Sequence, residues 1–117
     1  MEIKKMQELF KKKRCVYAIT FNNSVAYIGQ TQQDVGTRIA QHLAEEGTVK
    51  KYIRKYGLDN MQVEVVYEYK RKHQDLDKWL NDKETEYMQK YQKMGYKLIN
   101  ISKMSKIRGW QKRQSLI

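Results

Sequence analysis

The stretch that decides the fold is CVYAITFNNSVAYIGQT, residues 15–31, in which two apolar runs flank a short polar segment. The β-branched and aromatic residues of each run predict strands over residues 15–21 and 24–30. Asn22 and Asn23 lie between the runs, and asparagine tolerates the left-handed backbone that a tight hairpin requires. Tyr17 and Tyr27 are close to opposite each other across this turn, so their rings are candidates for one shared face.

Periodicity predicts the elements that follow the hairpin. Glycines mark the ends of three apolar-periodic segments, as expected for helices, and MQVEVVYE alternates as a strand does. The expected order is ββααβα in a single α/β (α+β) domain, with a small three-stranded antiparallel sheet flanked by helices. The predicted elements after the hairpin are helices over residues 33–46 and 48–56, a strand over 61–68 with Val63, Val65 and Tyr67 on one face, and a helix over 74–94.

Length and composition exclude several classes of protein. The 117 residues, of which 40% are hydrophobic and 32% charged, are typical of one globular domain. No apolar run approaches the ~20 residues of a membrane helix, and residues 1–14 lack the apolar segment of a secretory signal. A single cysteine, Cys15, excludes an internal disulfide. We therefore expect a cytoplasmic protein with no membrane and no disulfide partner.

The formal net charge of +11 is concentrated at the two ends of the chain. Residues 1–14 carry six basic and two acidic side chains, and residues 101–117 carry five basic and no acidic ones, whereas residues 15–100 have a net charge of only +2. Such ends are typical of proteins that bind the phosphate backbone of nucleic acids, although an anionic membrane surface attracts the same charge. The predicted nucleic-acid contacts are Lys11, Lys12, Lys13, Arg14, Lys103, Lys106, Arg108, Lys112 and Arg113.

These charge boundaries also suggest the domain organisation. We predict a basic N-terminal arm or short helix over residues 1–13, a folded domain over residues 14–102 and a basic C-terminal tail over residues 103–117.

One acidic residue falls on the apolar face of the long helix predicted over residues 74–94. Glu84 follows Leu80 by four residues and precedes Met88 by four, so the three side chains share one side of the helix. A carboxylate there must be paired, bound to a metal or placed at the mouth of a cleft, because burying it alone is costly. Glu84 is therefore either a functional residue or the partner of a lysine or arginine at the edge of the core.

The helix predicted over residues 33–46 carries a second unusual pattern. Val35, Ile39 and Leu43 would form its buried face, and Arg38 and His42 lie one turn apart on the flank of that face. Guanidinium and imidazole groups both donate hydrogen bonds to anions, so the pair suits a phosphate. An arginine paired with a nearby acid and a half-buried surface histidine would produce the same pattern.

Another constellation competes with this one. Glu68-Tyr69-Lys70 has the E-x-K spacing of a different large nuclease class, and Asp59 lies upstream. Two carboxylates and a lysine can hold a metal and a water. The spacing is expected by chance in a lysine-rich chain, however, and Asp59 falls in a predicted turn. The two histidines have no cysteine partners and give no structural zinc site.

The ordered set of motifs resembles the GIY-YIG nuclease family. CVY at 15–17 and YIG at 27–29 correspond to the two tripeptides of that family, with Cys15 and Val16 in place of the usual glycine and isoleucine. The asparagine of the family often follows GY directly, and here it comes three residues later, in GYKLIN. The resemblance covers roughly residues 14–102 and continues in the family's order with Arg38, His42, Glu84 and Asn100.

The resemblance implies hydrolysis of a phosphodiester bond in DNA with one divalent ion, Mg²⁺ or Mn²⁺. It implies that Glu84 is the metal ligand and that Tyr17 is the general base or the group that positions the attacking water. Arg38 would favour the phenolate form of Tyr17 or clamp the scissile phosphate. Tyr27 and His42 would hold the nucleophile and the phosphate in line.

The resemblance also implies two supporting residues. Gly29 would let the backbone turn sharply out of its strand, and Asn100 would help to seat the helix that carries Glu84.

We therefore predict a stand-alone, metal-dependent DNA endonuclease whose basic ends hold the substrate. The alternative is a non-catalytic nucleic-acid-binding module on the same fold, and a third reading is a basic interaction protein in which Tyr17 and Tyr27 only pack the strands. By analogy, a short chain of this kind suits a phage or a mobile element, acting in a bacterial cell or a phage-infected host.

Overall fold

The hairpin at the centre of the fold consists of β1 (Cys15–Phe21) and β2 (Val25–Thr31), which are antiparallel. The computed structural model describes residues 8–70 and 75–99. Asn22 and Asn23 both have a φ of 54°, the left-handed conformation expected of them. The amide of Ser24 donates to the Phe21 carbonyl over 3.0 Å and closes the turn. The second strand begins one residue later than the predicted range.

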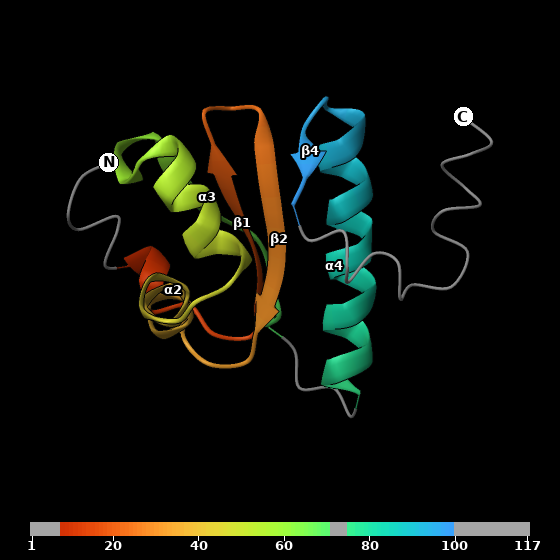
Figure 1. Cartoon of the computed structure of the whole chain (residues 1–117). Coiled ribbons are helices and arrows are strands. Elements are labelled where there is room, and N and C mark those ends of the chain that lie inside the picture. Colours follow the sequence, from red (N-terminus) through yellow and green to blue (C-terminus); the bar gives the residue numbers. More distant parts are fainter. Residues whose placement is uncertain (1–7, 71–74, 100–117) are drawn as a thin grey trace.

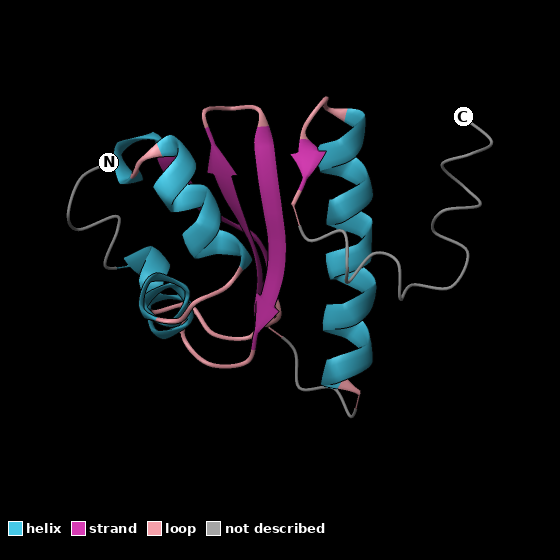
Figure 2. Ribbon diagram, viewed as in Figure 1, coloured by secondary structure: helices cyan, strands magenta, loops and turns pink. Residues whose placement is uncertain are grey.

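The sheet has four strands in the order β3-β1-β2-β4 (Figure 2). The predicted three-stranded, fully antiparallel sheet was therefore wrong in its edge: β3 (Met61–Glu68) pairs antiparallel with β1, but β4 (Lys97–Leu98) pairs parallel with β2. The Lys97 amide donates to the Ser24 carbonyl over 3.0 Å, and the Ile99 amide donates to the Ala26 carbonyl over 2.9 Å. A two-residue strand is too short to show alternation, and so the pattern did not reveal it.

A β-bulge changes which face the end of β3 presents. Val16 pairs with Tyr67, whereas its neighbour Tyr17 pairs with Val65, so the register shifts by one residue between them. Val63 and Val65 therefore pack in one core cluster and Tyr67 against the other. The expectation that Val63, Val65 and Tyr67 share a face was wrong because it assumed an unbroken period of two.

Helices cover the hairpin from two sides. α2 (Val35–Ala44) and α3 (Thr48–Tyr56) lie on one side, and α4 (Leu76–Lys93) lies on the other with β4 (Figure 1). A 3-10 turn, η1 (Leu58–Asn60), leads from α3 into β3. Without this turn, the order of the labelled helices and strands is ββααβαβ, and the domain is of the α+β class as predicted.

Each side of the sheet has its own apolar core. On the α4 side, Val16, Ala18, Ala26 and Ile28 of the hairpin pack with residues of α4 that include Leu80, Met88 and Tyr91. On the α2 side, the opposite faces of the same two strands pack with Val35, Ile39 and Val49. Leu43 was expected on this buried face but is 41% exposed, so Val35 and Ile39 are the buried residues of α2.

The described part of the N-terminal segment is docked on the domain. Residues 8–10 are helical, and Phe10 packs against the core on the α2 side. The Val35 amide, at the start of α2, donates to the Lys12 carbonyl over 2.9 Å. Among the described residues, no helix has both the length and the apolar character needed to cross a membrane.

Candidate active site

A tyrosine and a histidine meet on the α2 side of the sheet. Tyr17 on β1 is fully buried, and its hydroxyl lies 2.8 Å from Nε2 of His42, which α2 carries in its last turn. The His42 ring is edge-on to the rings of Tyr17 and Tyr27, with centroid separations of 6.0 and 5.1 Å. The predicted flank of α2 thus delivers His42 to the two tyrosines.

The two tyrosines lie on the same face of the hairpin but are not directly opposite each other. Tyr17 pairs with Gly29 and Tyr27 pairs with Ile19, so the tyrosines are diagonal neighbours with ring centroids 6.4 Å apart. The expectation that they are close to opposite was wrong by two residues of register. An even shift keeps both rings on one face, which is why they still meet.

Gly29 is required by space and not by backbone conformation. It lies within β2 and has no positive φ, so the predicted sharp turn out of the strand does not occur there. A Cβ added to Gly29 would lie 2.5 Å from both Cζ and the hydroxyl oxygen of Tyr17, and 2.9 Å from Cε1 of Tyr27. Because Gly29 has no side chain, the Tyr17 ring can occupy this space as it crosses β2.

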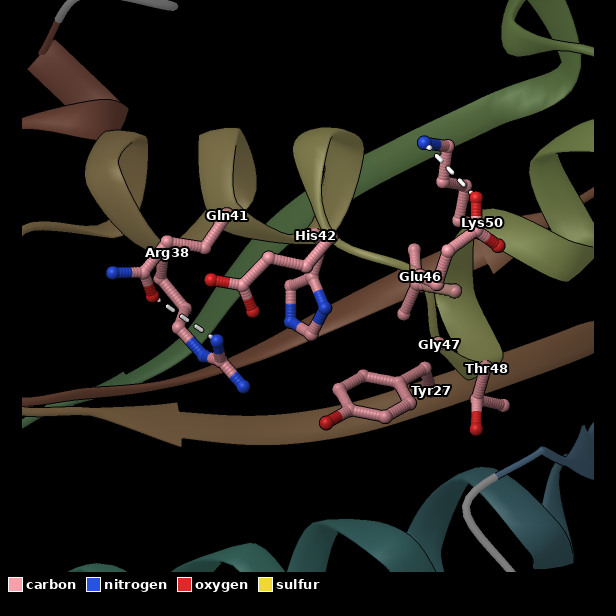
Figure 3. Close-up of a pocket in the computed structure, with 10 residues that line it drawn as sticks. Tyr27, Arg38, Gln41, His42, Glu46, Gly47, Thr48 and Lys50 are labelled. Atoms are coloured by element: carbon pink, nitrogen blue, oxygen red, sulfur yellow. Dashed lines mark hydrogen bonds and ion pairs between the residues drawn. The ribbon is translucent and has the colours of Figure 1, made fainter.

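Arg38 projects from α2 beside these rings and is held by a residue that the sequence analysis missed. Its Nη1 donates to Oε1 of Gln41 over 3.1 Å, and Nε2 of Gln33 donates to the same oxygen over 3.1 Å. Figure 3 shows Arg38 and His42 projecting from α2 toward the strand that carries Tyr27, with the Gln41 side chain beside Arg38. The signal for Gln41 was its position three residues after Arg38, on the same side of the helix.

These side chains line an open cleft of about 200 Å³. Its walls come from β2, α2, the loop after α2 and the start of α3 (Figure 3). The lining residues are Tyr27, Arg38, Gln41, His42, Glu45, Glu46, Gly47, Thr48, Val49 and Lys50.

Glu84 comes from the opposite side of the sheet. It is 2% exposed and lies on the buried face of α4 between Leu80 and Met88, as the helical pattern predicted. In the described residues β4 pairs only with Val25 and Ala26, so the rest of β2 is an edge of the sheet. A side chain of α4 can pass this edge toward the opposite face of the sheet.

Contacts and electrostatics both place Glu84 near that edge. The side-chain Nε2 of Gln30, on β2, donates to Oδ1 of Asn81, which lies one helical turn before Glu84. Burial is the largest cause of the raised pKa values of Tyr17 and Tyr27, and the negative charge of Glu84 makes a smaller contribution in the same direction. Side chains from both sides of the sheet therefore act on the same two hydroxyl groups.

Burial is the main influence on the protonation states of Tyr17, Tyr27 and His42. It raises the pKa of Tyr17 well above its ordinary value of 10.0, and the nearby Arg38 charge lowers it only in part. The pKa of Tyr27 is also raised, again mainly by burial. Burial, followed by the charge of Arg38, lowers the pKa of His42 from 6.5 to about 4. At neutral pH both hydroxyls keep their protons and His42 is an uncharged imidazole.

The donor set suits a hard divalent cation bound by few protein ligands. Residues 8–70 and 75–99 contain no group of three or more histidine, cysteine, aspartate or glutamate side chains that could hold a metal ion. Mg²⁺ is commonly bound by one or two carboxylates, with waters and substrate phosphate oxygens as the remaining ligands. A single carboxylate such as Glu84 fits that mode, and it does not fit a structural zinc site.

The competing E-x-K constellation does not assemble. At the end of β3, Oε1 of the half-buried Glu68 lies 3.6 Å from Nζ of the exposed Lys70 in an ion pair. Asp59 is exposed in η1, at the opposite end of the same strand. The two carboxylates are thus separated by the length of β3 and cannot share an ion.

The predicted nucleic-acid contacts are only partly within the described residues. Lys11, Lys12, Lys13 and Arg14 line a shallow hollow with Glu8, Glu68, Tyr69 and Lys70, and three of these four basic side chains are exposed. Outside the described residues lie Asn100, Lys103, Lys106, Arg108, Lys112 and Arg113.

A comparison with protein families agrees with this geometry. A family model described as the GIY-YIG catalytic domain matches residues 13–97 of the chain. Comparisons with curated proteins and with solved structures find no match. The matched range contains the cleft, its two tyrosines and the buried glutamate.

Proposed function

The chain belongs to the GIY-YIG family of nucleases, and on that premise we propose that it is a divalent-metal-dependent endonuclease that hydrolyses phosphodiester bonds in DNA. The observation that carries the proposal is the 2.8 Å contact between the Tyr17 hydroxyl and His42, at a cleft that Tyr27 and Arg38 also line. A hydroxyl, a neutral imidazole and a guanidinium at one cleft are the groups that phosphodiester hydrolysis needs.

Tyr17 would act as a neutral hydroxyl and not as a phenolate, because burial raises its pKa. In the proposed step Tyr17 donates its proton to Nε2 of His42 and accepts a proton from the attacking water. The water oxygen forms a bond to phosphorus, and the bond from phosphorus to the 3′ oxygen breaks, so that this oxygen leaves as an alkoxide and takes up a proton from solvent. His42 holds the proton at the end, which its neutral state at pH 7 allows.

Arg38 would bind a non-bridging oxygen of the scissile phosphate. A guanidinium group remains charged at every relevant pH and stabilises the additional negative charge of the transition state. Gln41 limits the directions in which Arg38 can point, because its Oε1 accepts hydrogen bonds from both Arg38 Nη1 and Gln33 Nε2. Tyr27 would align the water or the phosphate from the neighbouring position on the hairpin.

Glu84 would hold Mg²⁺ or Mn²⁺, which when bound would stabilise negative charge on the leaving oxygen. Its position between Leu80 and Met88, both fully buried, gives the carboxylate little freedom to move. The basic residues at 11–14 and at 103–113 would hold the phosphate backbone of DNA.

A closed circular plasmid tests the proposal. We expect the wild-type protein to cut it with Mg²⁺ and to leave it intact with EDTA. A nucleic-acid-binding module without catalysis would instead retain the plasmid in a salt-dependent manner and leave it uncut under both conditions. That result, on linear and single-stranded DNA as well, would exclude the nuclease activity for these substrates.

A further inference from the structure

α3 presents a basic face that the charge balance of the sequence conceals. Residues 15–100 are almost neutral overall, yet the nine residues of α3, TVKKYIRKY, carry four cations and no acid. Lys51, Arg54 and Lys55 are exposed, and Lys50 is half-buried. The face is thus a compact positive patch within the matched domain and separate from the two basic ends.

One acidic side chain, from the loop before α3, lies on this patch. Nη2 and Nη1 of Arg54 bind the two carboxylate oxygens of Glu46 over 2.6 and 3.1 Å. Nζ of Lys50 lies 3.4 Å from Oε1 of the same carboxylate. A guanidinium that holds two oxygens of one anion, with an ammonium group beside it, is the arrangement that binds a phosphate as well as a carboxylate.

Two of these three residues, Glu46 and Lys50, line one end of the cleft to which Arg38 and His42 also contribute. Glu46 and Lys50 line the cleft together with Tyr27, Arg38 and His42, and Figure 3 shows the Glu46–Lys50 pair beyond His42 along the same groove. A DNA strand with one phosphate at Arg38 would therefore run past Lys50 with a neighbouring phosphate.

We infer that Lys50 and Arg54 bind a DNA phosphate next to the scissile one, and that Glu46 occupies this site in the free protein until the phosphate displaces it. The inference deepens the proposed function and rests on it, since it assigns the path of the DNA strand beyond the cleft.

Displacement is energetically easy. The side chains of Glu46 and Arg54 are 70% and 61% exposed, and ion pairs between exposed side chains contribute little to stability because water screens them. A released Glu46 carboxylate can be hydrated at once. The exchange nevertheless weakens DNA binding, because the carboxylate competes with the phosphate for both cations.

The test measures the affinity of a short labelled DNA duplex in EDTA for wild type, Glu46→Gln and Glu86→Gln. Glu86 is the matched control, because it pairs with Lys83 over 3.0 Å on α4, on the other side of the sheet. Each variant removes one negative charge; Glu46→Gln frees Lys50 and Arg54, and Glu86→Gln frees Lys83. We expect Glu46→Gln to bind about fivefold more tightly, with a salt dependence of log K steeper by about 1 to 2, and Glu86→Gln to bind less than about twofold more tightly.

A second pair of variants tests the cations directly. The double variant Lys50→Ala/Arg54→Ala should bind DNA at least about tenfold more weakly, with a salt slope shallower by about 2. Lys78→Ala/Lys93→Ala, which removes two exposed cations from α4, should have a smaller effect. Thermal unfolding of all four variants verifies that they fold.

Equal affinities of Glu46→Gln and Glu86→Gln would overturn the inference, because the gain would then be only a general charge effect. Equal losses in the two double variants would overturn it as well. Plasmid cleavage by the wild-type protein is scored separately. If the affinities follow the expected order but no DNA is cut, the phosphate site stands and the proposed nuclease activity fails.

Discussion

The two sides of the sheet hold the predicted site residues in different ways. α2 supplies Arg38 and His42 from the flank of its buried face, where both are partly exposed and directed by hydrogen bonds. α4 supplies Glu84 from the middle of its buried face, where packing fixes it. The groups proposed to meet the substrate are therefore partly exposed and positioned by hydrogen bonds, whereas the carboxylate proposed to bind an ion is held by packing.

We expect the largest effect when the charge of Glu84, on the α4 side, is removed. Glu84→Gln keeps the shape of the side chain but removes its charge, so we expect plasmid cleavage to fall by about 10³-fold or more. Glu86→Gln, two residues along α4 and in an exposed ion pair, should cleave as the wild type does. Equal activity of the two variants would show that α4 provides no reacting group.

The next effect concerns the α2 side of the sheet. Tyr17→Phe removes the hydroxyl that contacts His42, and we expect cleavage to fall by about 10²-fold. Adding His42→Gln should cost little more, because the two residues act as one unit. Tyr91→Phe is the control on the α4 side, where the hydroxyl of a buried tyrosine donates to Glu64 over 3.2 Å. Loss of cleavage in that variant would argue for a general packing effect.

The close approach of the Tyr17 ring to Gly29 is tested by adding a methyl group at Gly29. The methyl group of Gly29→Ala would overlap the Tyr17 ring, so we expect the free energy of unfolding to fall by about 1–3 kcal/mol and cleavage to fall with it. Gly47→Ala is the matched variant, since a Cβ there has no atom within 4 Å and φ is an extended 172°. Urea unfolding of both variants would refute the overlap if their stabilities were the same.

The smallest effect is a pH dependence of stability through His42. Its pKa is about 4 in the folded protein and 6.5 ordinarily, so the unfolded chain binds the extra proton between these values. The free energy of unfolding should therefore be highest above pH 6.5 and decrease toward pH 4. The loss should be about 1–2 kcal/mol, less than the full shift implies because His42 is partly exposed.

Chemical unfolding at a series of pH values measures this loss. His42→Gln should flatten the decrease, whereas His73→Gln should retain it. An unchanged slope in His42→Gln would assign the pH dependence to other groups.

Local patterns predicted much of this architecture. The hairpin was readable because Asn22 and Asn23 interrupt two apolar runs, and the buried position of Glu84 was readable because it lies one turn from both Leu80 and Met88. These inferences need only the periods of strands and helices. The match of residues 13–97 to a nuclease family confirms the resemblance drawn from the same motifs.

Other features depend on contacts that no local pattern contains. β4 is visible only when residues 97–98 meet β2, and the bulge at Val16 only when β3 pairs with β1. The role of Gly29 depends on the path of the Tyr17 ring across a neighbouring strand. The pairing of Glu46 with Arg54 joins residues eight apart, from a loop and a helix. Each is a tertiary contact, and so it follows from the fold and not from the sequence period.

The two-residue strand β4 limits how the chain can vary in length. It is bound to β2 directly after the turn that ends α4, so α4 cannot slide along the sheet without breaking that pairing. Glu84 lies nine residues before the end of α4 at Lys93, roughly 13 Å along the axis at ~1.5 Å per residue. A one-residue insertion or deletion between Lys93 and Lys97 would therefore alter the depth of a carboxylate more than two helical turns away. Natural variation in this turn should consist of substitutions, with its length held constant.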